Sequence, residues 1–121
     1  MDPDRAFMTF LGEQLDAAGI GSVSLRRMFG STGVFCDGLM IGLVDRDDVL
    51  YLRVDGESRE AFVEAGFGDP FTYGKQGKVV SLGYLRIPDG VLDEPEALAL
   101  WGRESLTAAQ RIASGRGRRG T

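Results

Sequence analysis

Apolar residues recur at helical spacing near both ends of the chain and at strand spacing between them. A first helix is predicted to start at Pro3, with Asp2 as its N-cap and Gly19 as its end. Its apolar face consists of residues three or four positions apart: Phe7, Leu11, Leu15 and Ala18. These signals predict an amphipathic helix that covers a sheet.

The segment after this helix is expected to be mostly extended. An extended stretch is predicted around residues 23–29, and Gly30-Ser31-Thr32-Gly33 then interrupts the pattern. Asp37-Gly38 between two short apolar runs, 34–36 and 39–41, is a strong two-residue hairpin signal. A strand over 49–54 is expected to place Leu50, Leu52 and Val54 on one face and Tyr51 and Arg53 on the other.

The second half of the chain predicts a helix, a hairpin and a last helix. Asp55 is the expected N-cap of a short helix that Gly66 ends, and a hairpin around Gln76-Gly77 follows over 71–87. The last helix is expected to begin with Asp93 as a capping-box residue. Its apolar face would hold Leu98, Trp101, Ser105, Ala108 and Ile112, and Trp101 is expected to anchor it on the sheet.

The predicted order of elements is α-β-β-β-α-β-β-α. Hairpin links between the strands imply an antiparallel sheet, with the helices mainly on one of its faces. The predicted fold class is therefore a two-layer α+β domain. Residues 1–114 are assigned to this domain, and residues 115–121, all Gly, Arg or Thr, to a mobile tail.

Composition narrows the chemistry. The chain has 121 residues, a net charge of -4, one cysteine and no histidine. Without histidine and with a single thiol, zinc, haem and iron–sulfur sites are not expected, and no cofactor or catalytic residue is predicted. Cys36 is interpreted as a small apolar strand residue. The acidic N-terminus and the lack of a long apolar run predict a soluble, cytoplasmic protein without membrane contact.

Two glycine-rich strings are interpreted as structural. The string from Gly115 to Gly120 matches the dinucleotide-binding pattern, but it follows a helix and has no strand before it. Gly30-Ser31-Thr32-Gly33 lacks the Gly-Lys-Ser/Thr ending of a phosphate loop, so a tight strand connection is favoured.

The candidate interaction residues are basic or aromatic. Arg26 and Arg27 are expected on opposite faces of a strand, with one paired to an acid such as Asp55 and the other facing an anionic ligand. Tyrosines 51, 73 and 84 are interpreted as core residues in preference to an open stacking surface. The full candidate surface comprises Arg26, Arg27, Tyr51, Arg53, Lys75, Lys78, Tyr84, Arg116, Arg118 and Arg119. Binding of nucleic acid through the tail arginines, aided by Arg111, is expected to be weak at most, because the rest of the chain is acidic.

Several motifs together resemble a known family. They comprise the stretch from Arg26 to Asp55, Pro70-Phe71-Thr72-Tyr73, Gly77-Lys78, Tyr84, and Pro88 before the last helix. The pattern is similar to the N-terminal domain of TfoX, the Sxy-type regulator of bacterial competence, and spans the chain from about Phe7 to Trp101. The resemblance implies a compact two-layer α+β domain with a regulatory, non-enzymatic role in competence or transcriptional control. It also implies an unidentified protein partner. A homodimer, a weak nucleic-acid binder and a small-ligand-binding domain remain open.

Overall fold

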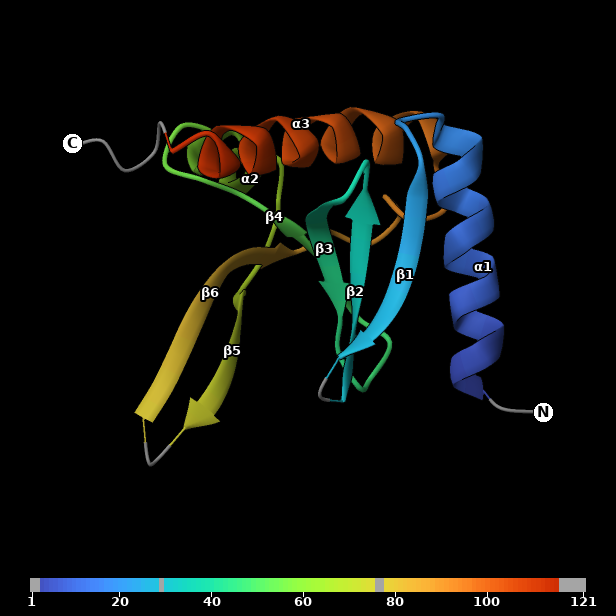
Figure 1. Ribbon diagram of the computed structural model, residues 1–121, viewed down its shortest axis with the longest axis horizontal. Helices are drawn as coiled ribbons and strands as arrows, with labels where there is room; N and C mark the ends of the chain where they lie inside the picture. The colour runs from blue at the N-terminus through green and yellow to red at the C-terminus, as the bar shows by residue number, and fades with distance from the viewer. Residues whose placement is uncertain (1–2, 29, 76–77, 116–121) are drawn as a thin grey trace.

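The computed structural model describes residues 3–28, 30–75 and 78–115, with side chains for all of these except 3–5, 73–75 and 78–82. Three helices and six strands form one unit (Figure 1). In chain order they are α1 (Pro3–Ala18), β1 (Val23–Met28), β2 (Ser31–Cys36), β3 (Leu39–Val44), β4 (Leu50–Arg53), α2 (Arg59–Glu64), β5 (Pro70–Lys75), β6 (Lys78–Arg86) and α3 (Pro95–Ala113).

All strands belong to one antiparallel sheet with the order β1-β2-β3-β4-β6-β5. The α+β class and the antiparallel sheet predicted from the sequence are confirmed. Four strands precede α2, where the predicted order had three, because the extended segment at Val23–Met28 pairs with β2 along its whole length. β2 also begins three residues earlier than predicted, at Ser31, so Gly33 belongs to a strand and not to a loop.

One face of the sheet and all three helices form a single apolar cluster. Strand residues such as Val34, Ile41 and Leu52 pack in it with Leu11 of α1 and Leu98 of α3. The predicted alternation in β4 is confirmed, since Leu50 and Leu52 are buried and the residues between and after them are not. No helix of the described residues covers the opposite face of the sheet.

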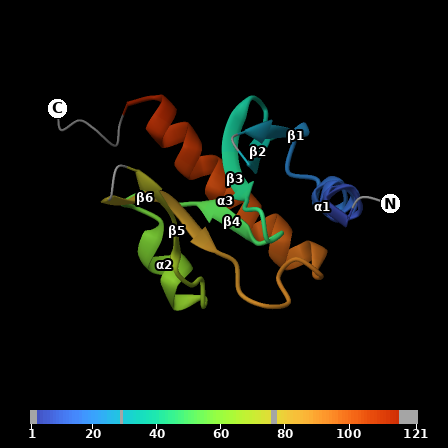
Figure 2. The same ribbon diagram turned by 90° about the horizontal axis from the view of Figure 1, so that it is seen from below.

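The helices meet around α3. α3 crosses one end of the strands, α1 runs crosswise to it at its beginning, and α2 lies beside its end (Figures 1 and 2). No helix among the described residues combines the length and apolar character needed to cross a membrane.

Local signals set several boundaries. Asp37 and Gly38 both have positive φ angles, 53° and 84°, as a primed two-residue hairpin requires, so this predicted turn is confirmed. The predicted cap of α3 is wrong. Its N-cap is Glu94, without a side-chain capping bond, because Pro95 occupies the first helical position and holds the residue before it extended.

Trp101 packs against the apolar cluster, as predicted, and its aromatic contacts come from α2 and the residues after it. Its ring lies 4.8 Å from that of Phe62 and 5.3 Å from that of Phe67, and these two rings are themselves 4.7 Å apart. Phe62 is fully buried, whereas Trp101 is half-buried. Ile112, which was also expected on the buried face, is 38% exposed. The aromatic trio therefore fixes α2 against the middle of α3.

A buried ion pair fixes the C-terminal end of α3. The Arg111 guanidinium donates to both carboxylate oxygens of Asp55, at 2.6 and 2.9 Å, and their side chains are only 14% and 10% exposed. Asp55 also accepts hydrogen bonds from the backbone N–H and the hydroxyl of Ser58, so it closes the turn that leads into α2. These bonds, with Arg111 first, hold the pKa of Asp55 far below its usual range despite burial. The prediction that Asp55 is the N-cap of α2 is wrong, because Ser58 holds that position.

We expect Trp101→Ala to lower the free energy of unfolding by about 3 kcal/mol, the low end for a large aromatic, because the side chain is half-buried. Urea unfolding followed by circular dichroism measures it. Leu100→Ala is the matched control, since Leu100 is 51% exposed on the same helix and should change stability by less than about 0.5 kcal/mol. Equal effects of the two substitutions would contradict the anchoring role.

Asp55→Asn should cost about 3 kcal/mol at neutral pH, because Arg111 is left without its charged partner in a buried site. The folded-state pKa of Asp55 is lowered, so its contribution is fully present above the unfolded pKa of about 3.9 and is lost as the pH falls below that value. The stability gap between wild type and Asp55→Asn should therefore narrow below about pH 4. Glu57→Gln is the control, because Glu57 also contacts Arg111 but is 71% exposed. A gap that stays constant down to pH 2 would contradict this account.

Candidate functional site

The uncovered face of the sheet, here called the open face, carries one row of paired residues across five strands. Arg26 pairs with Gly33, Gly33 with Leu43, Leu43 with Tyr51, and Tyr51 with Arg86. Cross-strand partners point to the same side of a sheet, so this row has arginines at its two ends and an apolar centre. The open face therefore differs from the mainly apolar face beneath the helices.

The centre of the open face is hollow. A cleft of about 650 Å³, here called the open-face cleft, is lined by Met28, Ser31, Gly33, Met40, Leu43, Asp45, Arg46, Tyr51, Pro70, Phe71 and Thr72. This volume lies in the range of small-ligand pockets. Its lining comes from β1, β2, β3, β4 and β5, so residues of both sheet edges border it.

Gly33 lets two side chains of the open face pack closely on the strand. A Cβ atom at this position would lie 2.8 Å from a ring carbon of Phe35 and 2.9 Å from the sulfur of Met28. Because Gly33 has no side chain, the Phe35 ring and the Met28 thioether lie directly over its backbone.

A bulge in the pairing of β2 and β3 determines which residues of β3 lie at the floor of the open-face cleft. Val34 pairs with Gly42, but the next residue, Phe35, pairs with Met40, so Ile41 is an extra residue in β3. Ile41 is fully buried in the core, and the alternation changes phase after it. Met40 and Leu43 therefore both reach the open face although they are three residues apart.

Asp45 lies at the end of the cleft away from α3, where its carboxylate accepts three hydrogen bonds. One carboxylate oxygen accepts hydrogen bonds from the backbone N–H groups of Asp47 and Val49, and the other accepts one from the Tyr51 hydroxyl at 3.2 Å. Burial raises the pKa of Tyr51, and the Asp45 carboxylate raises it further, so the phenol stays protonated. The Tyr51 ring is thereby fixed, and it meets the Phe71 ring edge-on at 5.3 Å.

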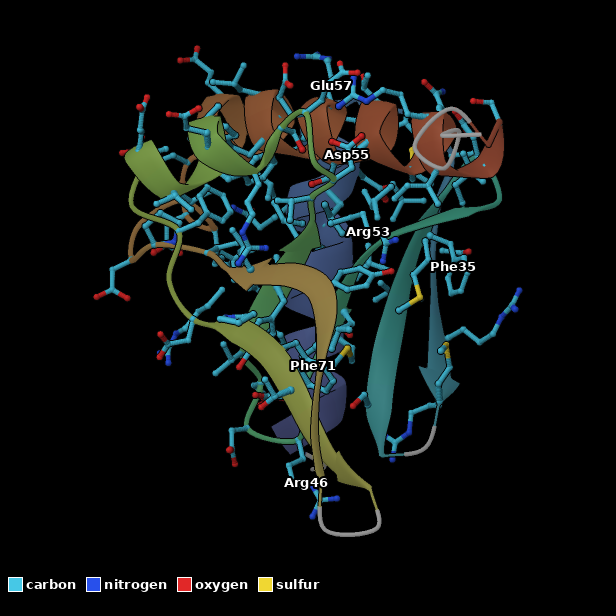
Figure 3. All side chains as sticks on the ribbon, turned by 90° about the vertical axis from the view of Figure 1, so that its left-hand side faces the viewer. Phe35, Arg46, Arg53, Asp55, Glu57 and Phe71 are labelled. Carbon is cyan, nitrogen blue, oxygen red and sulfur yellow. The ribbon has the colours of Figure 1, made fainter. Side chains whose placement is uncertain are left out.

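Three arginines of the open face have defined neighbours. The Arg26 guanidinium lies 4.7 Å from the centre of the Phe35 ring, and that of Arg53 lies 4.8 Å from the centre of the Tyr84 ring. Arg53 points into the space between β6 and β2, whereas Arg46 lies at the end of the sheet away from α3 (Figure 3). Arg46 passes against the β1–β2 turn, with a guanidinium nitrogen 3.4 Å from where a Cβ of Gly30 would stand.

Arg27 lies on the other face, as the strand alternation predicted. It lines a smaller hollow of about 260 Å³ with Met8, Gly30, Thr32, Asp45, Arg46 and Asp48. The predicted pairing of Arg26 or Arg27 with Asp55 is wrong, because Arg111 of α3 occupies that carboxylate. The same contact removes Arg111 from the residues that were expected to assist nucleic-acid binding by the tail.

The predicted interaction residues lie in different parts of the molecule, and some of their side chains are outside the described residues. Arg26, Tyr51 and Arg53 come together on the open face, whereas Tyr84 is buried there, which confirms its interpretation as a core residue. Burial raises the pKa of Tyr84, and the neighbouring Arg53 lowers it in part. The side chains of Tyr73, Lys75 and Lys78, and all of Arg116, Arg118 and Arg119, lie outside the described residues.

Sequence reasoning missed most of the cleft lining. The sequence predicted that Met28 and Phe71 lie in strands. The local pattern did not indicate on which face of the sheet their side chains would lie. Arg46 stood in a charged turn and Arg86 at a strand end, where charged residues are ordinary. Only the register across several strands brings these side chains together.

The described part of the chain contains no metal-binding cluster, and its cysteine is buried. No three His, Cys, Asp or Glu residues gather there in a way that could hold a metal ion. Cys36 is fully buried, and burial, with Asp37 nearby, raises the pKa of its thiol. Its sulfur approaches the carbonyl oxygen of Ile20 at 3.7 Å, so the interpretation of Cys36 as a small core residue is confirmed.

Comparison with known proteins adds the family. No curated protein matches the chain. The sequence model of the TfoX N-terminal domain family matches residues 13–109. The match runs from within α1 to within α3 and includes every residue that lines the open-face cleft. The chain therefore belongs to the TfoX N-terminal domain family.

Proposed function

We propose that this protein is a non-enzymatic regulatory domain that binds a protein partner through its open face. The open-face cleft carries this proposal, since it is a concave, mainly apolar surface on the side of the sheet without helices. A concave site of this volume with a mainly apolar lining is the kind of surface at which proteins bind a partner or a ligand. Membership of the TfoX N-terminal domain family supports a role in the control of competence or transcription, in the cytoplasm.

The chemistry of the lining supports a binding role over catalysis. Ser31 and Thr72 bring hydroxyl groups to the cleft, but the sequence contains no histidine to activate them. The lining carboxylate, Asp45, is engaged by two backbone N–H groups and by Tyr51. An acid or base for proton transfer needs a free, reachable group, whereas the Asp45 carboxylate already accepts three hydrogen bonds.

A nucleic-acid role is the second candidate, because four arginines lie on the open face and more lie in the tail. We expect only weak binding, near a dissociation constant of ~10⁻⁴ M, that disappears at physiological salt and after removal of residues 115–121. Fluorescence titration with duplex and single-stranded oligonucleotides at low and physiological salt measures it. Submicromolar, sequence-selective binding by the shortened protein would favour the nucleic-acid role instead.

The proposed function predicts that a charge placed in the cleft abolishes partner capture. Met40→Glu puts a carboxylate into the lining, and we expect the proteins captured from the native cell by wild type to be lost by this variant. Val63→Glu is the matched control, because Val63 is 52% exposed on α2, on the helical side. Quantitative mass spectrometry of the captured proteins gives the readout.

Met40→Ala provides a second variant that removes apolar surface without adding charge. Both cleft variants should keep the wild-type circular dichroism spectrum, which separates loss of binding from loss of the fold. If Met40→Glu and Met40→Ala capture the same proteins as wild type, the open face is not the interaction surface.

A further inference from the structure

Four arginines lie on or beside the open face in a protein whose net charge is -4. Arg26 and Arg86 end the residue row that crosses the sheet, Arg46 lines the cleft, and Arg53 follows Tyr51 by two residues in β4. Among the described residues, Asp45 is the carboxylate in the lining, and the exposed Asp47 lies beside Arg46 in the chain. The described helices carry more exposed acids than exposed arginines: Glu13, Asp16, Glu60, Glu64, Glu96 and Glu104 against Arg59 and Arg103. The arginines of the open face therefore contrast with a helical layer rich in acids.

The four arginines retain hydrogen-bonding capacity. The ion pairs within the described residues involve Arg111, and none joins an open-face arginine to a carboxylate. Arg26 and Arg53 are stacked on aromatic rings, which fixes their stems without occupying their N–H groups fully. Arg46 and Arg86 are exposed at two sides of the cleft. A guanidinium in this state is suited to a carboxylate, which it can bind through two N–H groups.

The side chains at the centre of the open-face cleft suit an apolar side chain better than a nucleotide base. Bases stack on flat, exposed rings, but here the Tyr51 and Phe71 rings meet edge-on. Tyr84 is buried and Phe35 already carries Arg26. The remaining lining is flexible and aliphatic, chiefly Met28, Met40 and Leu43, and methionine-rich surfaces adapt to apolar side chains of different shapes. The cleft thus accepts an apolar anchor and its rim accepts acids.

We infer that the open face binds an acidic, amphipathic segment of a partner protein, whose apolar side chain enters the cleft while flanking carboxylates contact Arg46 and Arg86. This inference rests on the proposed function and specifies the chemistry of its partner. The negative helical layer of the domain repels such a segment, so the segment is directed to one side of the molecule.

The test begins with a phage-displayed library of random twelve-residue peptides, selected on the full chain. Wild type should enrich peptides that contain Leu, Phe or Met between Asp or Glu residues. An enriched peptide is then synthesised with fluorescein and titrated by fluorescence anisotropy. Arg46→Glu/Arg86→Glu should weaken its binding by about tenfold or more, because two rim attractions become repulsions.

Arg59→Glu/Arg103→Glu is the matched control. It introduces the same charge change at exposed arginines of α2 and α3, and the peptide affinity should change by less than about twofold. Wild-type melting temperatures for both double variants exclude unfolding as the cause. Methyl resonances of Met28 and Met40 should shift on peptide addition, which locates the peptide in the cleft.

Each other outcome overturns the inference in a distinguishable way. Apolar peptides without acidic bias, lost with Met40→Glu but unaffected by Arg46→Glu/Arg86→Glu, would overturn the acidic partner and keep the proposed function. Selected peptides that bind both cleft variants unchanged would overturn the proposed function as well. Oligonucleotide binding at physiological salt that needs the rim arginines but not Met40 would identify nucleic acid as the occupant. A dimer lost with the same arginine substitutions would identify the acidic layer of a second copy.

Discussion

The whole structure depends on one apolar cluster between the three helices and one face of the sheet. Three helices of this length can cover a single face, and they do so through one continuous cluster that joins α1, α2 and α3 to the strands. The entropy of ordering the chain is offset mainly by this burial. The other face relies on contacts among its own side chains, such as Arg26 on Phe35 and Tyr51 against Phe71.

The connection between β4 and α2 shows how the one-sided layer is secured at its far end. Asp55 leaves the last core strand, closes the turn before α2 and receives the guanidinium of Arg111 from the end of α3. Three elements are thus joined at one carboxylate, while the aromatic trio around Trp101 joins two of them a few turns earlier. The cation also lies in the last turn of α3, where the helix dipole favours it. The aromatic packing around Trp101 and the Asp55–Arg111 ion pair therefore stabilise the same junction between α3 and the segment that contains α2.

Local patterns predicted what depends on near neighbours. The alternation of Leu50, Tyr51 and Leu52, the Asp37-Gly38 turn and the helix stops at Gly19 and Gly66 follow from side-chain period and positive φ, and the structure has them all. The Asp55–Arg111 pair did not follow, because 56 residues separate its members and either of two other arginines was an equal candidate. The cleft did not follow either. Its floor depends on the extra residue Ile41, which no periodic pattern reveals, and on a register that links five strands.

Gly33 shows how a residue without a side chain fixes its neighbours. A Cβ atom there would lie 2.8 Å from a ring carbon of Phe35 and 2.9 Å from the sulfur of Met28, so a side chain would force at least one of them to move. The Phe35 ring in turn carries the Arg26 guanidinium, 4.7 Å from its centre. A substitution at this one glycine would therefore displace an aromatic ring and, with it, the arginine stacked on that ring.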